Sequence, residues 1–335
     1  MTKRIHKILF ILILIQGLTC LSYISQKDYF SFIILPDTQY YSFSHPEIFH
    51  KQVDWIVKNK YLLNIKYVIH MGDITDEDQE YEWKVASSCF KTLENSGIPY
   101  SIVYGDNDIK DPDKYKARYD GTRHTELLNK YFPVSRFDKP GSWWKGGFFE
   151  SGKIDNYFCL FECDGIKFMI MNLEIAPRDA IISWANLIIS KNISRKVIIV
   201  THDFIDPEGN RLDDLGDFGM DGVDNMGNAK GNNATTLYKK LIKDNPNVLM
   251  VLCGHKSGEF EKKIEKSEDS GEKRIVFEIL TDYQNERLNG SGDKCGNGLL
   301  RVLKFYPGKK EIVLSRVNTL TEKREGKKIQ LSMEQ

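Results

Sequence analysis

Short apolar runs alternate with longer amphipathic segments along most of the chain. The apolar runs are rich in β-branched and aromatic residues and mostly stop at turn-forming or polar residues, which is typical of β-strands. The predicted strands are Phe30–Leu35, Tyr67–Met71, Tyr100–Tyr104, Tyr157–Glu162, Ile166–Leu173, Lys196–Val200, Val248–Cys253, Arg274–Leu280, Leu299–Phe305 and Glu311–Arg316. Four intervening segments are predicted helices: Pro46–Lys60, Glu80–Glu94, Arg178–Ser190 and Thr235–Lys243. This alternation predicts an α/β fold in which helices cover the sheets.

The rest of the chain divides into turns, one long loop and a charged end. Asp164-Gly165 is a tight turn between two predicted strands, and Asp206–Asn232 is a long loop rich in Gly, Asp and Asn. No internal repeat and no second composition regime appears. We therefore expect one large domain over residues 28–320, followed by a charged tail, 321–335, that frays.

The N-terminus has the pattern of a targeting segment. Three basic residues within the first seven precede an apolar run, Ile8–Ile15, that is too short to favour a full membrane span. Residues 1–22 are therefore predicted to be a signal peptide, and the chain to be secreted or exported. Two alternatives attach it to a membrane: the leader stays uncleaved as a signal anchor, or Cys20 carries a lipid.

Composition and charge indicate a chain with a substantial core and argue against nucleic-acid binding by bulk charge. Hydrophobic residues make up 41% of the 335 residues, enough for a substantial core, and 47 basic residues balance 47 acidic ones. The balance gives no support to a nucleic-acid partner held by bulk charge. Beyond Cys20 there are five cysteines, and Cys159 and Cys163 lie on one face of a predicted strand. A disulfide and buried free thiols are both compatible with this spacing.

Five predicted strands are followed by a residue of metal-binding type. These residues are Asp37, Asp73, Asp106, His202 and His255. Each alone fits turn or helix-cap chemistry. Ligands of open α/β sheets bind outside the carboxyl ends of the strands, so five such residues in this order predict one shared metal centre. Carboxylates and imidazoles together suit Mn, Fe, Zn or Mg.

The motifs around these residues resemble the calcineurin-like metallophosphoesterases. The motifs are Asp37-Thr38-Gln39, Gly72-Asp73, Gly105-Asp106-Asn107-Asp108, Thr201-His202 and Gly254-His255, in a resemblance that spans about Phe30 to Leu320. The first motif, Pro-Asp-Thr-Gln-Tyr-Tyr, is similar to that of a secreted branch, which also carries features like Asn172-Leu173-Glu174 and Asp282-Tyr283-Gln284. The resemblance implies a four-layer α/β/β/α sandwich of two packed mixed sheets flanked by helices.

The same resemblance implies roles for the candidate residues. Asp37 would bind metal one, Asp73 would bridge two metals, and Asp106, His202 and His255 would complete metal two. One or two divalent ions per chain are expected, with a metal-activated hydroxide attacking the phosphorus of a phosphate mono- or diester. The substrate is a phosphorylated small molecule or macromolecule. Asp73, Asp106 and Asn107 are the expected catalytic residues.

Three departures from the family pattern weaken this expectation. Gln39 and Ser257 stand where imidazole ligands of metal one are usual. Metal one is then left with Asp37, Asp73 and the amide oxygen of Gln39 as candidate ligands, a set better suited to Mg or Mn. Asn107 replaces the proton-donating His, and an amide cannot act as a general acid at neutral pH. His70 and His124 are possible substitutes, although each fits a structural role better. The alternative is a catalytically impaired relative that binds a metal and a phosphorylated ligand or partner.

One aromatic segment has two readings. Trp143-Trp144-Lys145-Gly146-Gly147 fits either a substrate-binding wall or ordinary core and turn packing. Aromatic residues beside glycines are more often packed in the core or at turns, which favours packing.

Overall fold

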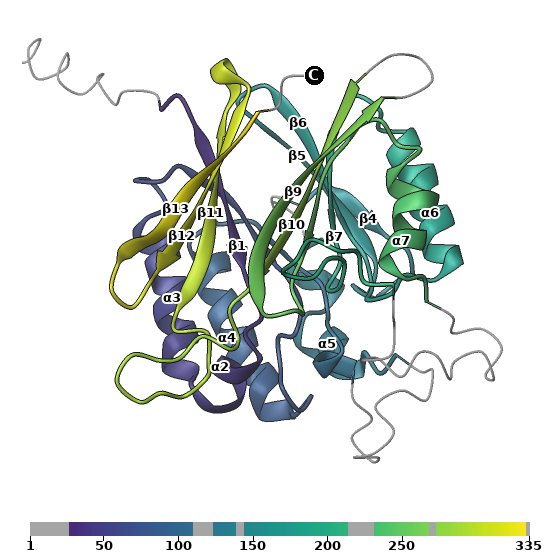
Figure 1. Cartoon of the computed structure of the whole chain (residues 1–335). Helices are drawn as coiled ribbons and strands as arrows, with labels where there is room; N and C mark the ends of the chain where they lie inside the picture. Colours follow the sequence, from purple (N-terminus) through teal and green to yellow (C-terminus); the bar gives the residue numbers. More distant parts are fainter. Residues whose placement is uncertain (1–26, 110–122, 139–143, 214–230, 268–272, 333–335) are drawn as a thin grey trace, which may run out of the picture.

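Two β-sheets packed face to face form the centre of the molecule, and helices lie on their outer sides (Figure 1). The computed structural model describes residues 27–109, 123–138, 144–213, 231–267 and 273–332. The predicted leader, residues 1–22 with Cys20, lies outside these ranges. Within the described residues, the arrangement confirms the predicted four-layer α/β fold.

The first sheet holds the N-terminal strands in its parallel half. Its strands, described within the ranges above, run in the order β13 (Lys323–Ser332), β12 (Glu311–Asn318), β11 (Leu299–Tyr306), β1 (Phe30–Leu35), β2 (Ile65–His70) and β3 (Tyr100–Ile102). The pairs β1–β2 and β2–β3 are parallel, and the others are antiparallel. The helices that follow its parallel strands are α2 (Gln39–Ser44), α3 (Pro46–Lys58), α4 (Glu80–Asn95) and α5 (Glu126–Tyr131).

The second sheet is mixed in the same way. Its strands run in the order β4 (Gly146–Phe148), β5 (Tyr157–Cys163), β6 (Ile166–Asn172), β7 (Lys196–Val200), β8 (Val248–Cys253), β10 (Lys273–Asp282) and β9 (Gly258–Ser267). Neighbours from β6 through β7 and β8 to β10 are parallel. Helix α6 (Asp179–Ser190), helix α7 (Ala234–Leu237) and a π-helical turn (Tyr238–Ile242) cover its outer face.

Aromatic side chains fill the space between the sheets. The Phe32 ring on β1 lies 5.3 Å from the Phe168 ring on β6 and 5.6 Å from the Phe161 ring on β5. A second core, built from residues such as Met169 and Ile181, lies between the second sheet and α6. Because each sheet buries both faces, its parallel strands consist almost entirely of buried residues.

Two charged strands were not expected. The prediction that the tail frays from Thr321 onward is wrong, because β13 pairs antiparallel with β12 and extends the first sheet to Ser332. Strand β9 likewise pairs with β10 at an edge of the second sheet. Both sequences are rich in Lys and Glu, which suits strands at sheet edges, where charge opposes pairing with other chains. The hydrogen bonds that pair these strands come from backbone groups, so their side chains can be as polar as those of a loop.

Other expectations are settled within the described residues. Trp144 packs in the core, with its ring stacked 5.1 Å from the Phe148 ring, so it does not line a substrate wall; Trp143 lies outside the described ranges. The five cysteines beyond Cys20 are buried free thiols. In the described parts of the chain, none of the helices combines the length and hydrophobicity needed to span a bilayer.

A buried carboxyl group on the loop before α4 makes stability depend on pH. Burial raises the pKa of Asp78 from 3.8 to about 8, against the opposing effect of the 2.6 Å hydrogen bond that Trp83 Nε1 donates to it. The folded chain keeps this proton up to about pH 8, whereas the unfolded chain loses it near pH 4. Raising the pH through this window therefore lowers the free energy of unfolding.

Asp78→Asn is expected to remove this part of the pH dependence. Asparagine copies the protonated acid and tolerates the positive φ of 53° at this position. Urea unfolding at pH 5 and pH 8 measures the effect: the loss of stability between the two pH values should be smaller in Asp78→Asn than in the wild type. Asp54→Asn, at an exposed position on α3, is the control. An unchanged difference in Asp78→Asn contradicts the assignment.

Candidate metal centre

Parallel pairing brings the first two candidate aspartates together. Strands β1 and β2 are paired so that Leu35 lies opposite His70, and the chain continues from these ends to Asp37 and Asp73. The Thr38 amide donates a 3.0 Å hydrogen bond to the Asp73 carbonyl, which ties the two loops to each other. Both aspartate side chains are buried at this edge of the sheet.

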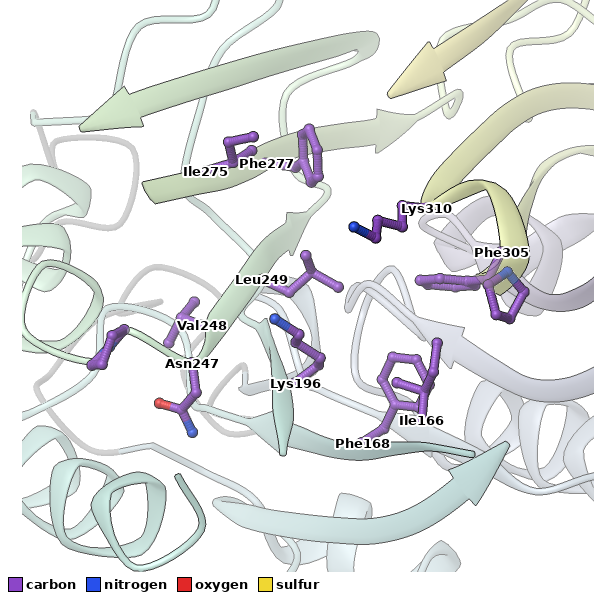
Figure 2. Close-up of a pocket in the computed structure, with 12 residues that line it drawn as sticks. Ile166, Phe168, Lys196, Asn247, Val248, Leu249, Ile275, Phe277, Phe305 and Lys310 are labelled. Atoms are coloured by element: carbon purple, nitrogen blue, oxygen red, sulfur yellow. The ribbon is translucent and has the colours of Figure 1, made fainter. Parts of the chain in front are cut away.

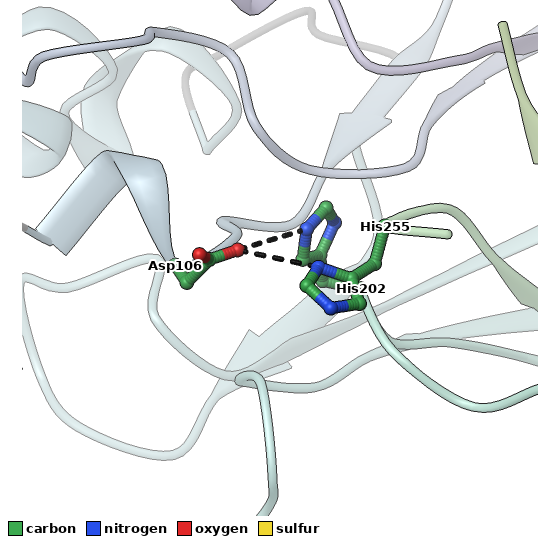
Figure 3. A group of neighbouring side chains, drawn as sticks. All are labelled: Asp106, His202 and His255. Carbon is green, nitrogen blue, oxygen red and sulfur yellow. Dashed lines mark ion pairs between the residues drawn. The ribbon is translucent and has the colours of Figure 1, made fainter. Parts of the chain in front are cut away.

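Asp106, His202 and His255 form a cluster beside them (Figure 3). Asp106 Oδ1 lies 3.4 Å from His202 Nε2 and 3.4 Å from His255 Nδ1. These side chains come from the ends of β3, β7 and β8, which belong to different sheets. The face-to-face packing of the sheets therefore assembles the cluster.

His202 also belongs to a second group with Asp37 and Asp73. In each group, one potential ligand atom per residue lies within 4.8 Å of the others. His202 Nε2 is 3.4 Å from Asp73 Oδ1 as well as from Asp106 Oδ1. The structure thus brings together all five strand-end residues singled out in the sequence.

The protonation of His202 tests whether a cation fits. Its Nδ1 lies 2.9 Å from the Met71 carbonyl oxygen, and because a carbonyl only accepts, Nδ1 carries the hydrogen. Nε2 is therefore the nitrogen that faces the two carboxylate oxygens, and it offers a lone pair to a cation once the ring is neutral. Neither His202 Nε2 nor Asp37 Oδ1 has a hydrogen-bond partner within the described residues. A divalent cation among these atoms would give them the partner that they lack, so the residues present fit a metal.

The electrostatics of the pocket support the same conclusion. Burial raises the pKa of Asp37 well above its usual range, and the nearby Asp282 raises it further. Burial acts to lower the pKa of His202, but the charges of Asp73 and Asp37 raise it well above its ordinary value. These carboxylates are buried close together, and a bound cation would offset both their desolvation and their mutual repulsion.

A family model described as "Calcineurin-like phosphoesterase" matches residues 30–257, a range that includes every strand-end residue of the centre. The chain belongs to the calcineurin-like phosphoesterase family. Members are typically dependent on two metal ions, which agrees with the two overlapping ligand groups. Family membership supports a metal-dependent hydrolase.

A curated relative and two solved structures extend the comparison. The chain is 33% identical over 283 residues to the uncharacterized protein YvnB of Bacillus subtilis (strain 168), covering 83% of this chain. It spans about a fifth (19%) of the length of that relative. Purple acid phosphatase PPD1 from yellow lupin seeds is 11% identical with a TM-score of 0.53, over 92% of this chain and 54% of that one. GAP50, described as the anchor in the inner membrane complex of Plasmodium, is 12% identical with a TM-score of 0.50, over 92% of this chain and 90% of that one. The two structures share the fold.

The three departures from the calcineurin-like pattern lie close to the centre but make other contacts. Asn107 Nδ2 donates to Asp73 Oδ2 at 2.7 Å and to Gln39 Oε1 at 2.6 Å. The Gln39 amide in turn donates to Gln284 Oε1. Ser257 Oγ accepts a 3.3 Å hydrogen bond from the Asn285 amide. Gln39 and Asn107 therefore form an amide pair over Asp73, and the oxygen of Gln39 that would bind a metal accepts a hydrogen bond instead.

His70 and His124 are the two possible substitutes for the proton donor that Asn107 replaces. His70 is buried, its Nε2 lies 2.9 Å from Thr38 Oγ1, and its Nδ1 accepts from the Gly72 amide at 3.1 Å. Burial lowers its pKa to about 3, so near neutral pH it is a neutral imidazole and not the imidazolium that a general acid requires. His124 lies just before α5, with Nδ1 3.9 Å from Glu126 Oε2. His70 therefore has the structural role expected of it.

Sequence reasoning assigned no role to Asp108 or Asp282. Asp108 accepts hydrogen bonds from the amides of Ile74, Thr75 and Gly105, at 3.0, 2.7 and 2.9 Å, so it joins the loops that carry Asp73 and Asp106. Asp282 ends β10, and burial raises its pKa to about 7. Both residues stand in motifs quoted above, and the position of Asp282 at a strand end was the available signal.

A glycine holds the Asp73 loop against His202. Gly72 has a φ of +101°, and a Cβ there would lie 2.5 Å from His202 Nδ1. Gly72→Ala is expected to cost about 3 kcal/mol or more, from backbone strain and overpacking together, and to weaken metal binding by displacing His202. Gly97→Ala is the matched control, since Gly97 also has a positive φ but its Cβ would have only Lys60 Nζ nearby, at 3.7 Å. Chemical unfolding of both variants checks the difference; equal losses contradict it.

Proposed function

We propose that this chain hydrolyses phosphate mono- or diesters with the help of divalent ions held by Asp37, Asp73, Asp106, His202 and His255. The observation that carries the proposal is the buried cluster in which His202 Nε2 faces carboxylate oxygens of Asp73 and Asp106, each at 3.4 Å. When bound, divalent ions would supply a nucleophilic water of lowered pKa and neutralise charge that develops on the phosphoryl oxygens.

The remaining residues of the pocket orient the ligands. The Met71 carbonyl fixes the tautomer of His202, and the His255 amide donates a 3.1 Å hydrogen bond to Asp37 Oδ2. Asp106 stands where the family usually has Asn. Burial acts to raise the pKa of Asp106, but its contacts with His202 and His255 hold that pKa below its usual range, so it is a charged ligand at neutral pH.

The substrate follows from the missing acid. Asn107 can donate a hydrogen bond but not a proton, and its Nδ2 already donates to Asp73 and Gln39. We therefore propose that the preferred substrates have leaving groups that depart without protonation, such as phenolates or nucleotide phosphates. The Pro-Asp-Thr-Gln motif and the basic and apolar leader support an exported enzyme of the secreted branch.

Metal analysis combined with hydrolysis tests this function. The full chain is freed of metal with a chelator, equilibrated with Mn, and assayed on p-nitrophenyl phosphate and bis(p-nitrophenyl) phosphate. Bound metal with turnover that disappears on chelation and returns with Mn is the expected result. Bound metal without turnover contradicts the enzyme.

A second function is favoured by one observation. Asn107 cannot supply a proton and its Nδ2 is engaged by neighbouring side chains, which suits a protein that binds a metal and a phosphorylated ligand or partner without hydrolysis. The fold allows both functions, since it is shared by a phosphatase and by a protein described as an anchor. Metal binding without turnover in the assay above is the result that favours this alternative.

A further inference from the structure

The end of the sandwich opposite the metal centre has its own chemistry. The described chain enters β1 from Lys27 at this end, whereas Asp37 lies beyond the other end of the strand (Figure 1). The turn between β11 and β12 and the start of β7 also lie here, because β7 ends beside His202. Residues at this end are therefore separated from the metal centre by the length of the strands.

An apolar pocket opens between the two sheets at this end. Its volume is about 380 Å³, and its apolar lining includes Phe168, Leu249, Phe277 and Phe305, which come from four strands of the two sheets. Figure 2 shows the Leu249, Phe277 and Phe305 side chains around a common space into which the Lys310 side chain extends. The pocket thus combines an apolar floor with a cation.

A second lysine stands at the same pocket. Lys196 and Lys310 both line it, and both are exposed. Within the described residues, neither ammonium group has a hydrogen bond or an ion pair to a side chain or carbonyl. Two like charges beside an apolar surface complement a ligand that carries both an anionic group and an apolar chain.

The surface beside the pocket continues this pattern. Pro307 lines both this pocket and a neighbouring one, where Lys27 and Lys309 stand with the acidic Asp28 and Asp164. Lys27 Nζ donates hydrogen bonds to the backbone carbonyls of two exposed residues in the loop between α3 and β2. They are Tyr61 and Leu62, whose side chains are 84% and 66% exposed.

We propose that this end of the sandwich is a docking face for an anionic phospholipid bilayer. The docking face comprises Lys27, Tyr61, Leu62, Lys196 and Lys310. An exposed Tyr and Leu beside lysines match the composition of surfaces that rest at the membrane interface, with lysines near lipid phosphates and the apolar groups below them. The apolar pocket receives a lipid chain whose headgroup lies near Lys196 and Lys310.

The place where the described chain begins supports the bilayer as the partner. Residues 1–26, with the apolar run Ile8–Ile15, precede Lys27, so a retained leader would enter the bilayer beside the docking face. The metal centre then faces away from the membrane. The docking face is independent of hydrolysis, because none of its residues belongs to the metal centre.

A fluorescent label on each end of the molecule tests the orientation. In the full chain with Cys20→Ser, an environment-sensitive dye is attached to Leu62→Cys or, as the matched control, to Phe43→Cys. Phe43 is 45% exposed on α2, near the metal centre, and the remaining cysteines are buried. With vesicles containing 30% phosphatidylglycerol, emission is expected to rise severalfold at position 62 and not at 43. No rise at 62, an equal rise at both, or an equal rise with pure phosphatidylcholine overturns the proposal.

Removing the lysines tests the charge. Lys196→Gln/Lys310→Gln is expected to weaken binding to the anionic vesicles about 25-fold, since each basic residue near such a surface contributes about 1 kcal/mol, roughly a fivefold factor. Lys84→Gln/Lys130→Gln, at exposed positions on α4 and α5, is the control and should bind as the wild type does. Equal binding by the two double variants overturns the proposal. Turnover in solution should be the same in the wild type and in Lys196→Gln/Lys310→Gln.

Discussion

Asp73→Asn is expected to abolish tight binding of divalent ions and to lower turnover of bis(p-nitrophenyl) phosphate at least ~100-fold. Asp73 is a ligand candidate in one group, and its Oδ1 also faces the His202 nitrogen that both groups share. An amide at this position loses the negative charge and can coordinate through only one oxygen. Metal content after equilibration with Mn, measured together with turnover, checks the result.

The Asp73→Asn variant needs a control for folding. Asp73 accepts hydrogen bonds from Asn107 N and Nδ2, at 3.0 and 2.7 Å, and an amide preserves only one of them. Metal-free wild type and metal-free Asp73→Asn should nevertheless unfold in the same cooperative manner, because the buried charge that is lost was itself costly. A folded variant that retains metal and full turnover would remove Asp73 from the centre.

Asn107→His is expected to raise turnover of alkyl phosphates by ~10²–10⁴, with a much smaller effect on p-nitrophenyl phosphate. An imidazole at this position supplies the proton that an alkoxide leaving group needs, whereas p-nitrophenolate departs without one. Asn107 is only partly buried, which leaves room for the larger ring. The ratio of kcat/KM for the two substrates is the measurement.

Asn107→Gln separates proton donation from a change of shape. It keeps an amide while enlarging the side chain, so it should leave the substrate ratio near that of the wild type. A gain in Asn107→His that is equal for both substrates would show that the pocket was reshaped and that proton supply does not limit turnover. The same assay thereby decides whether the missing acid explains the substrate preference.

The metal centre was predictable because the rule behind it concerns topology. Parallel strands end at a common edge, so an Asp or His after each strand indicates convergence even over the long separation between Asp37 and His255. The glycines before Asp73, Asp106 and His255 fit the same prediction, because a glycine lets the backbone turn sharply after a strand. The Cβ that Gly254 lacks would lie 2.3 Å from Asp37 Oδ1, a close approach that the sequence alone indicates only as a sharp turn.

The parts that were missed depend on contacts made by backbone or by amides. Strands β9 and β13 are held by ladder hydrogen bonds at sheet edges, so their charged side chains carry no hydrophobic signal. The four hydrogen bonds accepted by Asp108 come mainly from backbone amides, which every residue possesses. The pairing of Gln39 with Asn107 joins two residues that motif comparison treats one at a time.

The position of His202 between the two ligand groups limits how the centre fills. Nδ1 of His202 donates to the Met71 carbonyl, so only the lone pair of Nε2 is left to bind a metal. His202 nevertheless belongs to both ligand groups. A lone pair coordinates one ion, so two ions cannot be bound on equal terms. Calorimetric titration of the metal-free chain should therefore resolve a first, strong event and a weaker second one. The stoichiometry in a cell would then follow the local concentration of the metal.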